Sequence, residues 1–293
     1  NRVLFVATVD EHIRHFHLPF LQWFHDCGYE VHVAANGDEQ LAYCDVKHNL
    51  GFERTPFSAA NIPAARQLGD LLHRNTFRLV HFHTPVASVF GRFAARHARK
   101  NGTTVLYTAH GFHFFTGAPL KNWLFFFHAE RFMARYTDAL LVMNNEDYRR
   151  AQGFSVAKGV YLVHGVGIDT RRFSQGMDKE QARRQLDIPL NSIVLLSVGE
   201  LSLRKNHQLL LEALSCAKIK DIICLIAGQG KERQSLLDLA ERLGIADKVR
   251  LLGYTTDTAP LYAASDIFCF PSLQEGLPVA LMEAMACGLP CIA

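Results

Sequence analysis

The sequence predicts an α/β protein made of two doubly wound parallel-sheet domains, one after the other. Short runs rich in β-branched residues alternate with longer helical patterns, which is typical of parallel strands joined by crossover helices. The alternation occurs twice, on either side of a glycine-bearing, charged linker near residues 164–190. The 293 residues, 49% hydrophobic and 20% charged, are enough for two separate cores. We therefore expect one domain at residues 1–164 and a second at residues 165–293.

The first domain is expected to hold five strands joined by helices. Apolar, β-branched runs predict the strands at residues 3–7, 30–34, 79–82, 104–108 and 139–143. Helical periodicity predicts the helices at residues 16–27, 64–75, 86–101 and 120–136. The helices fall between the strands, so that successive strands can run parallel in one sheet.

The second domain repeats this order of elements. The expected strands are residues 192–198, 222–227, 249–252, 267–270 and 291 onward. The expected helices are residues 208–217, 232–243, 258–264 and 279–287. Because the chain stops within the last expected strand, we expect this domain to be incomplete at its C-terminal end.

Composition excludes several classes of protein. The formal net charge of +3 is too small to indicate a nucleic-acid-binding protein. The seven cysteines are scattered and include no Cys-x-x-Cys pair, which is typical of reduced thiols in the cytoplasm. No apolar run reaches the ~18 residues that a membrane-spanning helix needs. We expect a cytoplasmic protein whose association with a membrane, if any, is peripheral.

The strongest functional signal is the segment Glu275-Gly-Leu-Pro-Val-Ala-Leu-Met-Glu283. It joins the loop after the expected strand 267–270 to an apolar helix, with Pro278 in the first helical turn. Glu283 is the one charged residue of this helix, and a buried carboxylate is costly unless a hydroxyl or a cation satisfies it. Ribose hydroxyls would do so, and the free amides of Gly276 and Leu277 would face phosphates. The alternative is a surface Glu275 with Glu283 paired to an arginine.

Two other strand ends in the second domain carry residues suited to phosphate. Gly199 allows a ligand to approach the backbone, and Arg204 and Lys205 precede the next helix, where anions bind. The alternative there is a solvated basic turn. Gly228 and Gly230 form half of a nucleotide-binding fingerprint, or else a tight turn.

The first domain places histidines and an aspartate at strand ends. His110 follows the strand 104–108, and Asp10 and His12 follow the first strand, where they would reach a ligand. His81 and His83 share one face of a strand, so they invite a zinc hypothesis. No cysteine or carboxylate stands at ligand spacing beside them. We therefore expect no metal and no other cofactor.

An aromatic segment at residues 112–135 allows two interpretations. It could enter a membrane interface and receive a lipid-linked molecule, or its rings could form a core under a solvated face. Basic side chains that would face anionic lipid flank it or lie on the preceding helix: Lys121, Arg131, Arg135, Arg92, Arg96 and Arg99.

The segment from Phe270 to Pro290 resembles the Glu-x7-Glu signature of retaining GT-B glycosyltransferases of family 4, also called group 1. Other motifs of that family stand in the expected order: Val198-Gly-Glu-Leu with Lys205, Ile226-Ala-Gly-Gln-Gly230, Leu252-Gly-Tyr254 and Thr108-Ala-His-Gly111. The branch that assembles bacterial capsular polysaccharides and exopolysaccharides is the most similar. The resemblance implies two Rossmann-like domains facing across a cleft, the first for the acceptor and the second for a nucleotide-sugar donor.

The resemblance also implies roles for single residues. Lys205 would hold the donor diphosphate, Glu283 the ribose and Glu275 the transferred sugar, with His110 beside that sugar. The implied donor-binding residues are Gly199, Arg204, Lys205, Gly228, Gly230, Tyr254, Glu275, Gly276, Leu277 and Glu283. Those on the acceptor side are Asp10, His12 and His83. Glu200 stands where many relatives have arginine, and Pro278 where many have glycine.

These expectations combine into one function with two alternatives. The chain would transfer a hexose or N-acetylhexosamine, with retention, from a nucleotide-diphosphate sugar, preferably UDP-linked, to a lipid-linked saccharide for a cell-surface polysaccharide. A sugar-nucleotide 2-epimerase shares the architecture but would lack the Glu-x7-Glu spacing. A two-domain sugar-binding protein without catalysis would be exported.

Overall fold

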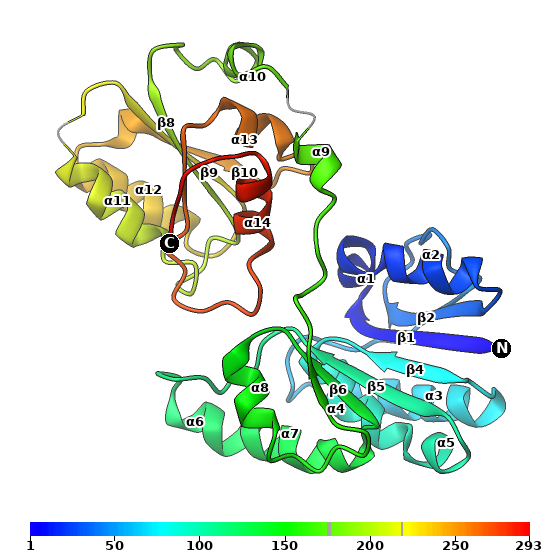
Figure 1. The fold of residues 1–293 in the computed structure, drawn as a ribbon. Helices are drawn as coiled ribbons and strands as arrows, with labels where there is room; N and C mark the ends of the chain where they lie inside the picture. Colours follow the sequence, from blue (N-terminus) through cyan, green and yellow to red (C-terminus); the bar gives the residue numbers. More distant parts are fainter. Residues whose placement is uncertain (175–176, 218) are drawn as a thin grey trace. The chain divides into compact units, whose positions relative to one another are not determined.

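The computed structural model describes residues 1–174, 177–217 and 219–293. The chain divides into two compact units, residues 1–166 and 167–293, each with its own parallel sheet (Figure 1). The predicted α/β class is therefore confirmed. The units meet two residues beyond the expected boundary at residue 164.

The N-terminal unit contains seven parallel strands in the order β3-β2-β1-β4-β5-β6-β7. Their bounds are β1 Arg2–Val9, β2 Glu30–Asn36, β3 Val46–Asn49, β4 Leu79–Phe82, β5 Thr104–Ala109, β6 Ala139–Val142 and β7 Val160–Leu162. Only five of them were expected. The two missed strands, β3 and β7, lie at the edges of the sheet and are three or four residues long. Edge strands are only partly buried, so they lack the apolar run that marks the central ones.

The helices of this unit are shorter and more numerous than the four expected ones. Their bounds are α1 Asp10–Phe16, α2 Leu18–Asp26, α3 Asn61–Arg74, α4 Pro85–Ala94, α5 Arg96–Lys100, α6 Leu120–Asn122, α7 His128–Met133 and α8 Asn145–Ala151. A π-helical turn at Trp123–Phe127 joins α6 to α7, and a 3₁₀ turn at Ala134–Tyr136 follows α7. The first expected helix, residues 16–27, corresponds to α2, and α1 was not expected; it begins at Asp10, directly after β1.

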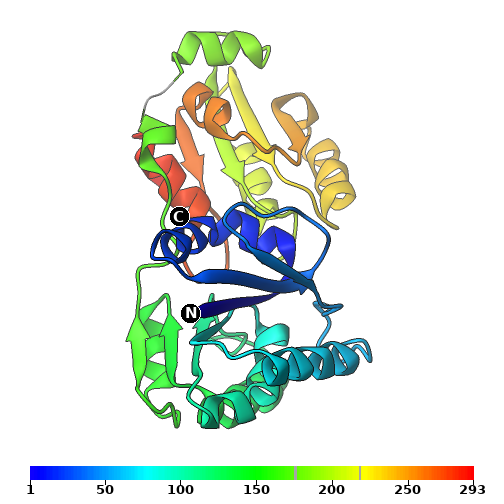
Figure 2. The same cartoon turned by 90° about the vertical axis from the view of Figure 1, so that its right-hand side faces the viewer.

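Two apolar clusters cover the two faces of the N-terminal sheet. Val3, Phe5 and Ala7 of β1 pack with Ile13 and Leu21 from α1 and α2. The alternate side chains of β1 pack on the other face with α3 and α4. Figures 1 and 2 show these two helices on that face of the sheet. This alternation follows from the two-residue period of a strand, and it leaves only the sheet ends open for polar groups.

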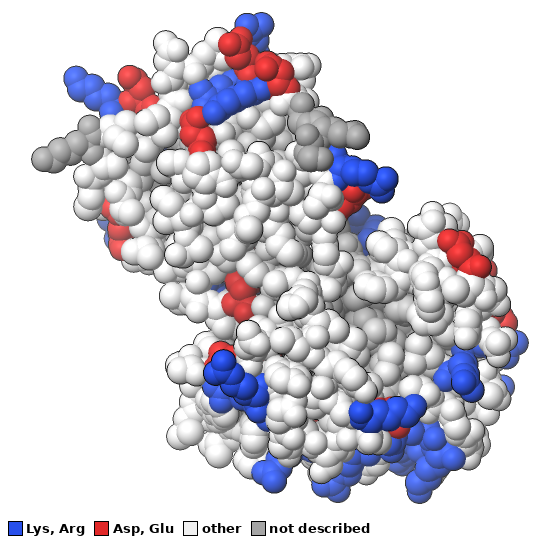
Figure 3. All heavy atoms as spheres, viewed as in Figure 1, with Lys and Arg blue, Asp and Glu red and all other residues white. Residues whose placement is uncertain are grey.

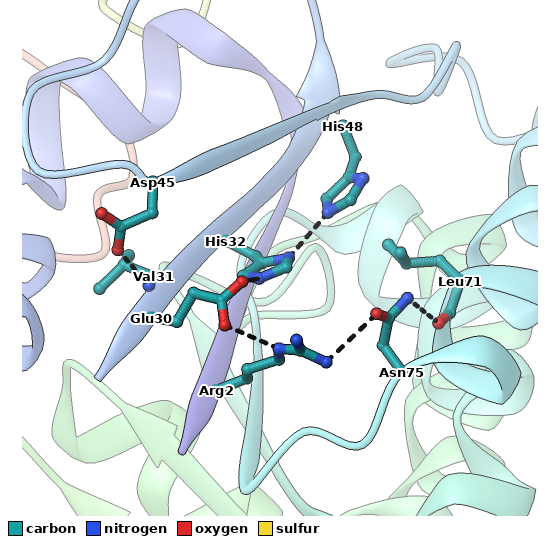
Figure 4. A network of polar contacts seen from close by, with 8 residues as sticks. All are labelled: Arg2, Glu30, Val31, His32, Asp45, His48, Leu71 and Asn75. Atoms are coloured by element: carbon teal, nitrogen blue, oxygen red, sulfur yellow. Dashed lines mark hydrogen bonds and ion pairs between the residues drawn. The ribbon is translucent and has the colours of Figure 1, made fainter. Parts of the chain in front are cut away.

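A polar network joins the first three strands at the end where β1 and β2 begin (Figure 4). The guanidinium of Arg2 donates to Glu30 at 2.8 Å, and Glu30 contacts the ring of His32 at 3.0 Å. A ring nitrogen of His32 lies 2.9 Å from one of His48, which stands on β3. These bonds give the edge strand polar as well as backbone contacts with its neighbours.

An ion pair is buried under the N-terminal sheet. Arg92 on α4 is 1% exposed and donates to Glu130 on α7 at 2.6 Å. The Tyr107 hydroxyl donates to the other carboxylate oxygen at 3.1 Å, and the Arg92 guanidinium lies 4.1 Å from the Tyr107 ring centroid. Both charges are therefore satisfied within the core.

This arrangement shows that the expected basic stripe of Arg92, Arg96 and Arg99 is wrong. Arg92 is internal, and Arg99 pairs with Asp138 at 2.9 Å. The expected helix 86–101 is also two helices, because α4 ends at Ala94 and α5 begins at Arg96. The helical spacing of the arginines is real, but their partners come from distant segments that the spacing does not show.

The C-terminal unit contains five parallel strands in the order β10-β9-β8-β11-β12. Their bounds are β8 Ile193–Val198, β9 Ile222–Ala227, β10 Val249–Gly253, β11 Ile267–Cys269 and β12 Cys291–Ile292. The helices are α9 Thr170–Ser174, α10 Lys179–Gln185, α11 His207–Cys216, α12 Arg233–Arg242, α13 Ala259–Ala264 and α14 Val279–Ala286, with a 3₁₀ turn at Ala246–Lys248. One apolar cluster joins α9, α10, α13 and α14 to the sheet, and a second joins α11 and α12.

Within the described ranges 1–174, 177–217 and 219–293, no helix has the length and apolar character needed to cross a bilayer.

The buried ion pair yields a prediction about stability. We expect Glu130→Ala to lower the free energy of unfolding by about 3–5 kcal/mol, because it leaves Arg92 charged and buried without its partner. Glu39→Ala is the control, since Glu39 pairs with Arg14 at 3.0 Å where both side chains are more than 40% exposed; we expect a loss of under ~1 kcal/mol. Chemical denaturation followed by circular dichroism measures both. Equal losses in the two variants would contradict the prediction.

Candidate functional site

Two cations and one carboxylate meet at the carboxyl end of the C-terminal sheet. The Lys205 ammonium lies 2.8 Å from Glu275 Oε1, and the Arg204 guanidinium lies 2.6 Å from the same oxygen. Lys205 is 13% exposed and Glu275 18%. The structure therefore brings together three of the residues that the sequence singled out.

Two loops hold these side chains in place. One follows β8 and the other follows β11, and β8 and β11 are neighbours in the sheet. The Leu273 amide donates to the Arg204 carbonyl oxygen at 2.9 Å, and the Arg204 side chain donates to the Gln274 carbonyl oxygen at 2.9 Å. The Lys205 ammonium also lies 4.9 Å from the Phe270 ring centroid. The cations are thus fixed to the loop that carries Glu275.

The glycines after β8 and β9 allow these strand ends to touch. A Cβ on Gly228 would overlap the Gly199 carbonyl oxygen, and one on Gly230 would overlap the Leu201 carbonyl oxygen. A Cβ on Gly199 would lie 3.0 Å from Cε of Lys205. In this structure Gly228 and Gly230 are packed against the loop after β8, so they shape the site through the backbone.

The helix α14 carries Glu283, whose carboxylate accepts from the Tyr262 hydroxyl at 2.8 Å. The expected alternative of an arginine partner is not what the structure shows. Burial raises the pKa of the Glu283 carboxyl, and burial also raises the pKa of the Tyr262 hydroxyl. Glu283 is only partly buried and keeps one side toward solvent. It therefore has room for a second partner.

The start of α14 differs slightly from expectation. Pro278 is the N-cap residue, one position before the first helical residue, and it is not within the first turn. Gly276 and Leu277 lie in the loop that precedes it. Tyr254 follows β10 and is 50% exposed. Gly276 and Leu277 therefore lie beside the start of α14. Tyr254 lies at the same edge of the sheet, because the carboxyl ends of parallel strands share one edge.

The carboxylate of Asp10, in the N-terminal unit, is already bound by other groups of the protein. It is 2% exposed, its carboxylate lies 2.9 Å from the Lys47 ammonium, and it accepts from the Glu39 amide at 3.1 Å. The expectation that Asp10 reaches a ligand from a loop is wrong in this structure. The cause is that α1 begins at Asp10 and turns its first side chain inward.

Four histidines gather at the carboxyl edge of the N-terminal sheet: His12, His17, His83 and His110. Burial lowers the pKa of His12 to about 3 and that of His110 to about 4. His83 is 1% exposed, and burial lowers its pKa well below the usual range. The rings are therefore neutral at pH 7. His12 also lines a cavity of about 300 Å³ together with Thr8, Arg54, Thr84 and Phe126.

Sequence reasoning missed two members of these sites. Tyr262 lies on α13, and nothing in the sequence indicates that its hydroxyl meets Glu283. His17 lies between α1 and α2, and no motif of the sequence indicates that its ring meets the strand-end histidines. His81 and His83 share a face as expected, but His81 binds the Thr108 hydroxyl at 2.8 Å and is not one of the four.

Comparison with known proteins identifies relatives of both units. Residues 178–293 match the family described as glycosyl transferases group 1, and residues 20–172 match glycosyltransferase family 4. The glycosyltransferase EpsD of Bacillus subtilis is 40% identical over 298 residues, covering 100% of this chain and 78% of its own length. The Escherichia coli UDP-Gal:alpha-D-GlcNAc-diphosphoundecaprenol alpha-1,3-galactosyltransferase is 31% identical over 237 residues, covering 77% of this chain and 59% of its own length.

A solved structure has the same fold. HepE of Anabaena, in complex with UDP and glucose, superposes with a TM-score of 0.79 at 18% identity. The match covers 100% of this chain and 80% of that one.

The close approach of the two glycine loops yields a prediction. We expect Gly230→Ala to destabilise the C-terminal unit by about 1–3 kcal/mol, because the new methyl group meets backbone that cannot rotate away. The matched control is Gly69→Ala on α3, where a Cβ meets nothing within 4 Å and the change should stabilise by about 0.5–1 kcal/mol. Thermal and chemical unfolding of both variants measure these effects. A neutral Gly230→Ala would show that the loops can separate at no cost.

Proposed function

This chain belongs to the group 1, family 4 glycosyltransferases, and we propose that it transfers a hexose or N-acetylhexosamine from a UDP-sugar, with retention, to a lipid-linked saccharide. The place we propose for this reaction is the synthesis of a cell-surface polysaccharide, at the cytoplasmic side of the membrane. The name of one relative supports the acceptor class, since the Escherichia coli galactosyltransferase acts on a diphosphoundecaprenol-linked sugar. The complex of HepE with UDP and glucose supports the donor class.

The ion-paired group of Lys205, Arg204 and Glu275 is the observation that carries the donor proposal. One carboxylate oxygen contacts both cations, so one positive charge of the group is left unbalanced. A diphosphate offers those cations a stronger, doubly charged partner. Its arrival would free Glu275 to accept hydrogen bonds from the hydroxyls of the transferred sugar. The same three side chains can therefore pair with one another or bind the donor.

The proposed chemistry follows from these positions. Lys205 and the free amides at the start of α14 stabilise the negative charge that develops on the departing diphosphate. Glu283 remains available to a ribose hydroxyl, while Tyr262 holds the carboxylate in one orientation. The leaving group is already a good one, so no carboxylic acid needs to protonate it. We propose that this step needs no metal ion on the diphosphate, and we assign no protein nucleophile.

His110 has a proposed role beside the transferred sugar. Its ring is neutral at pH 7, so it can donate one hydrogen bond without adding a charge. Asp10 has no proposed role in binding, because Lys47 already occupies it.

An exposed apolar patch supports the lipid-linked acceptor. It consists of Phe57, Leu120, Leu124 and Phe125, which are 81%, 74%, 58% and 61% exposed. The Phe57 and Phe125 rings meet at 6.4 Å, and both line a cavity of about 210 Å³ with Phe114 and other apolar side chains. The expected aromatic segment therefore divides into a buried half and an exposed half. Lysine and arginine side chains are frequent on the visible surface of this unit (Figure 3), as a partner of anionic lipid requires.

Removing Lys205 tests the donor site. We expect Lys205→Ala to lower kcat/KM by about 100- to 1,000-fold, the usual cost of losing one group that stabilises charge in the transition state. Glu275→Ala should cause a loss of similar size, and Glu275→Gln a smaller one. The measurement is release of UDP and formation of a glycoside from a panel of UDP- and GDP-sugars, with and without added Mg²⁺.

The control for these variants is Lys220→Ala, an exposed lysine that precedes β9 and so lies at the opposite end of the strands from the site; it should leave the rates unchanged. The proposal fails if no donor is consumed, or if Lys205→Ala and Glu275→Ala keep full activity. A UDP-sugar that is epimerised without transfer would instead support the epimerase. Strict dependence on Mg²⁺ would overturn the metal-free donor step.

The apolar patch predicts binding to membranes. We expect the double variant Phe57→Ser, Phe125→Ser to weaken binding to phosphatidylglycerol vesicles by about 100-fold, because burial of each exposed ring would contribute more than ~1.4 kcal/mol to the binding free energy. Leu190→Ser is the control, since Leu190 is 43% exposed in the other unit. Cosedimentation measures both. Equal binding of the double variant and the unsubstituted protein would contradict a membrane role for the patch.

A further inference from the structure

The histidine cluster lies at a point where open parallel sheets bind ligands. His12 stands on α1 after β1, His83 follows β4, and His110 follows β5. Strands β1, β4 and β5 are successive neighbours, so their carboxyl ends share one edge. The strand order reverses direction between β1 and β4, which makes this the switch point of the sheet. His17, between α1 and α2, completes the group from above that edge.

The geometry of the four rings suits one central atom. One ring nitrogen of each histidine lies within 4.8 Å of the chosen nitrogens of the other three. The two Nε2 atoms of His12 and His17 are 3.2 Å apart. Nitrogens that surround a tetrahedral metal ion at about 2.0–2.1 Å stand about 3.3 Å from one another. The cluster thus needs only small side-chain rotations to close around an ion.

The cluster also leaves buried nitrogens without partners. Among the described residues, neither ring nitrogen of His83 has a hydrogen-bond partner, and the same holds for Nδ1 of His17 and Nε2 of His110. His17 and His83 are 2% and 1% exposed. An unsatisfied buried polar group costs about 1–3 kcal/mol, so four such nitrogens in one place require an explanation. His81, in β4 two residues before His83, is hydrogen-bonded to the Thr108 hydroxyl. A buried histidine of this sheet can therefore have a protein partner.

The backbone beside His83 is strained in a way that fits a built site. Thr84 has a φ of +59°, which is rare for a β-branched residue. Its hydroxyl accepts from the Thr8 amide at 3.0 Å and lies 2.8 Å from the Thr8 hydroxyl, so the ends of β1 and β4 are tied together. Strain of this kind costs about 1–3 kcal/mol and gathers at functional sites.

We propose that His12, His17, His83 and His110 bind one transition-metal ion, with Zn²⁺ the best match. Four neutral imidazoles without a carboxylate disfavour Mg²⁺ and Ca²⁺, which take oxygen ligands. Zn²⁺ accepts four nitrogen ligands in a tetrahedron. A cavity of about 300 Å³ lies against the cluster, since His12 lines it.

The ion would hold the start of the chain's first helices on the sheet edge. Two ligands come from the α1 and α2 region and two from the ends of β4 and β5. Ligation through the unpartnered Nε2 leaves the other nitrogen of His110 available to substrate. Metal binding at these four histidines does not require the diphosphate chemistry proposed at Lys205.

Metal titration of the purified protein tests this site. The protein is freed of metal by a chelator, dialysed and titrated with Zn²⁺ and with Co²⁺. We expect one equivalent of either ion to bind, the Co²⁺ form to show the visible absorption of a tetrahedral complex, and Zn²⁺ to raise the unfolding temperature. The double variant His17→Gln, His83→Gln should weaken binding by more than about 100-fold, since loss of a second-shell group alone costs 10- to 100-fold.

Two controls keep the result specific. His81→Gln, beside the cluster, and the pair His32→Gln, His48→Gln, in the network of Figure 4, should each still bind one equivalent. Circular dichroism checks that each variant is folded. If the double variant does not fold, His12→Gln, on the partly exposed rim, takes its place. The proposal is overturned if the unsubstituted protein binds no ion, or if removal of these histidines leaves affinity and absorption unchanged.

Discussion

The parallel pairing of neighbouring strands is the constraint on which both candidate sites depend. Because β8, β9 and β11 run in the same direction, the loops that follow them meet at one edge of the sheet. Lys205, Gly228 and Glu275 are far apart in sequence, and this edge brings them into contact or onto adjoining loops. In the N-terminal unit, β1, β4 and β5 do the same for the histidines. Both faces of each sheet are covered by helices, so the edge is where polar chemistry can reach a ligand.

The proposed donor site combines closely packed backbone with ion pairs that a ligand could replace. The glycine contacts between the loops after β8 and β9 leave no space for a side chain. The pairs from Lys205 and Arg204 to Glu275 are partly exposed, and pairs of this kind contribute only about 1 kcal/mol or less. A ligand with two phosphates therefore has little to displace. The backbone of the site is therefore positioned when the protein folds, and ligand binding need not rearrange it.

The interior of the N-terminal unit treats its polar groups in two different ways. Arg92, Glu130 and Tyr107 form a buried group in which every charge has a partner. A few residues away, the strand-end histidines leave several nitrogens without one among the described residues. The same unit supplies hydrogen-bond partners for a buried arginine. The lack of partners for the histidine nitrogens is therefore a property of the sheet edge where they lie. This contrast is the physical basis for assigning a ligand to the cluster.

The sequence by itself determined the class of fold, the positions of the central strands along the chain and the segments that carry chemistry. It could do so because buried strands and amphipathic helices each have a characteristic pattern of apolar residues within a short segment. Glycines, cations and lone carboxylates at strand ends can likewise be recognised within a single segment. It did not predict β3 and β7, whose few residues are half exposed, or the inward turn of Asp10.

Only the tertiary structure decided which side chains meet. The partner of Glu283 is Tyr262, the partner of Arg92 is Glu130, and His83 lies with three histidines from other segments instead of acting with His81. Each of these contacts depends on strand order and register, which join residues 20 to 100 positions apart. No local pattern encodes such a distance. The residue types were therefore predictable from the sequence, and their pairing was not.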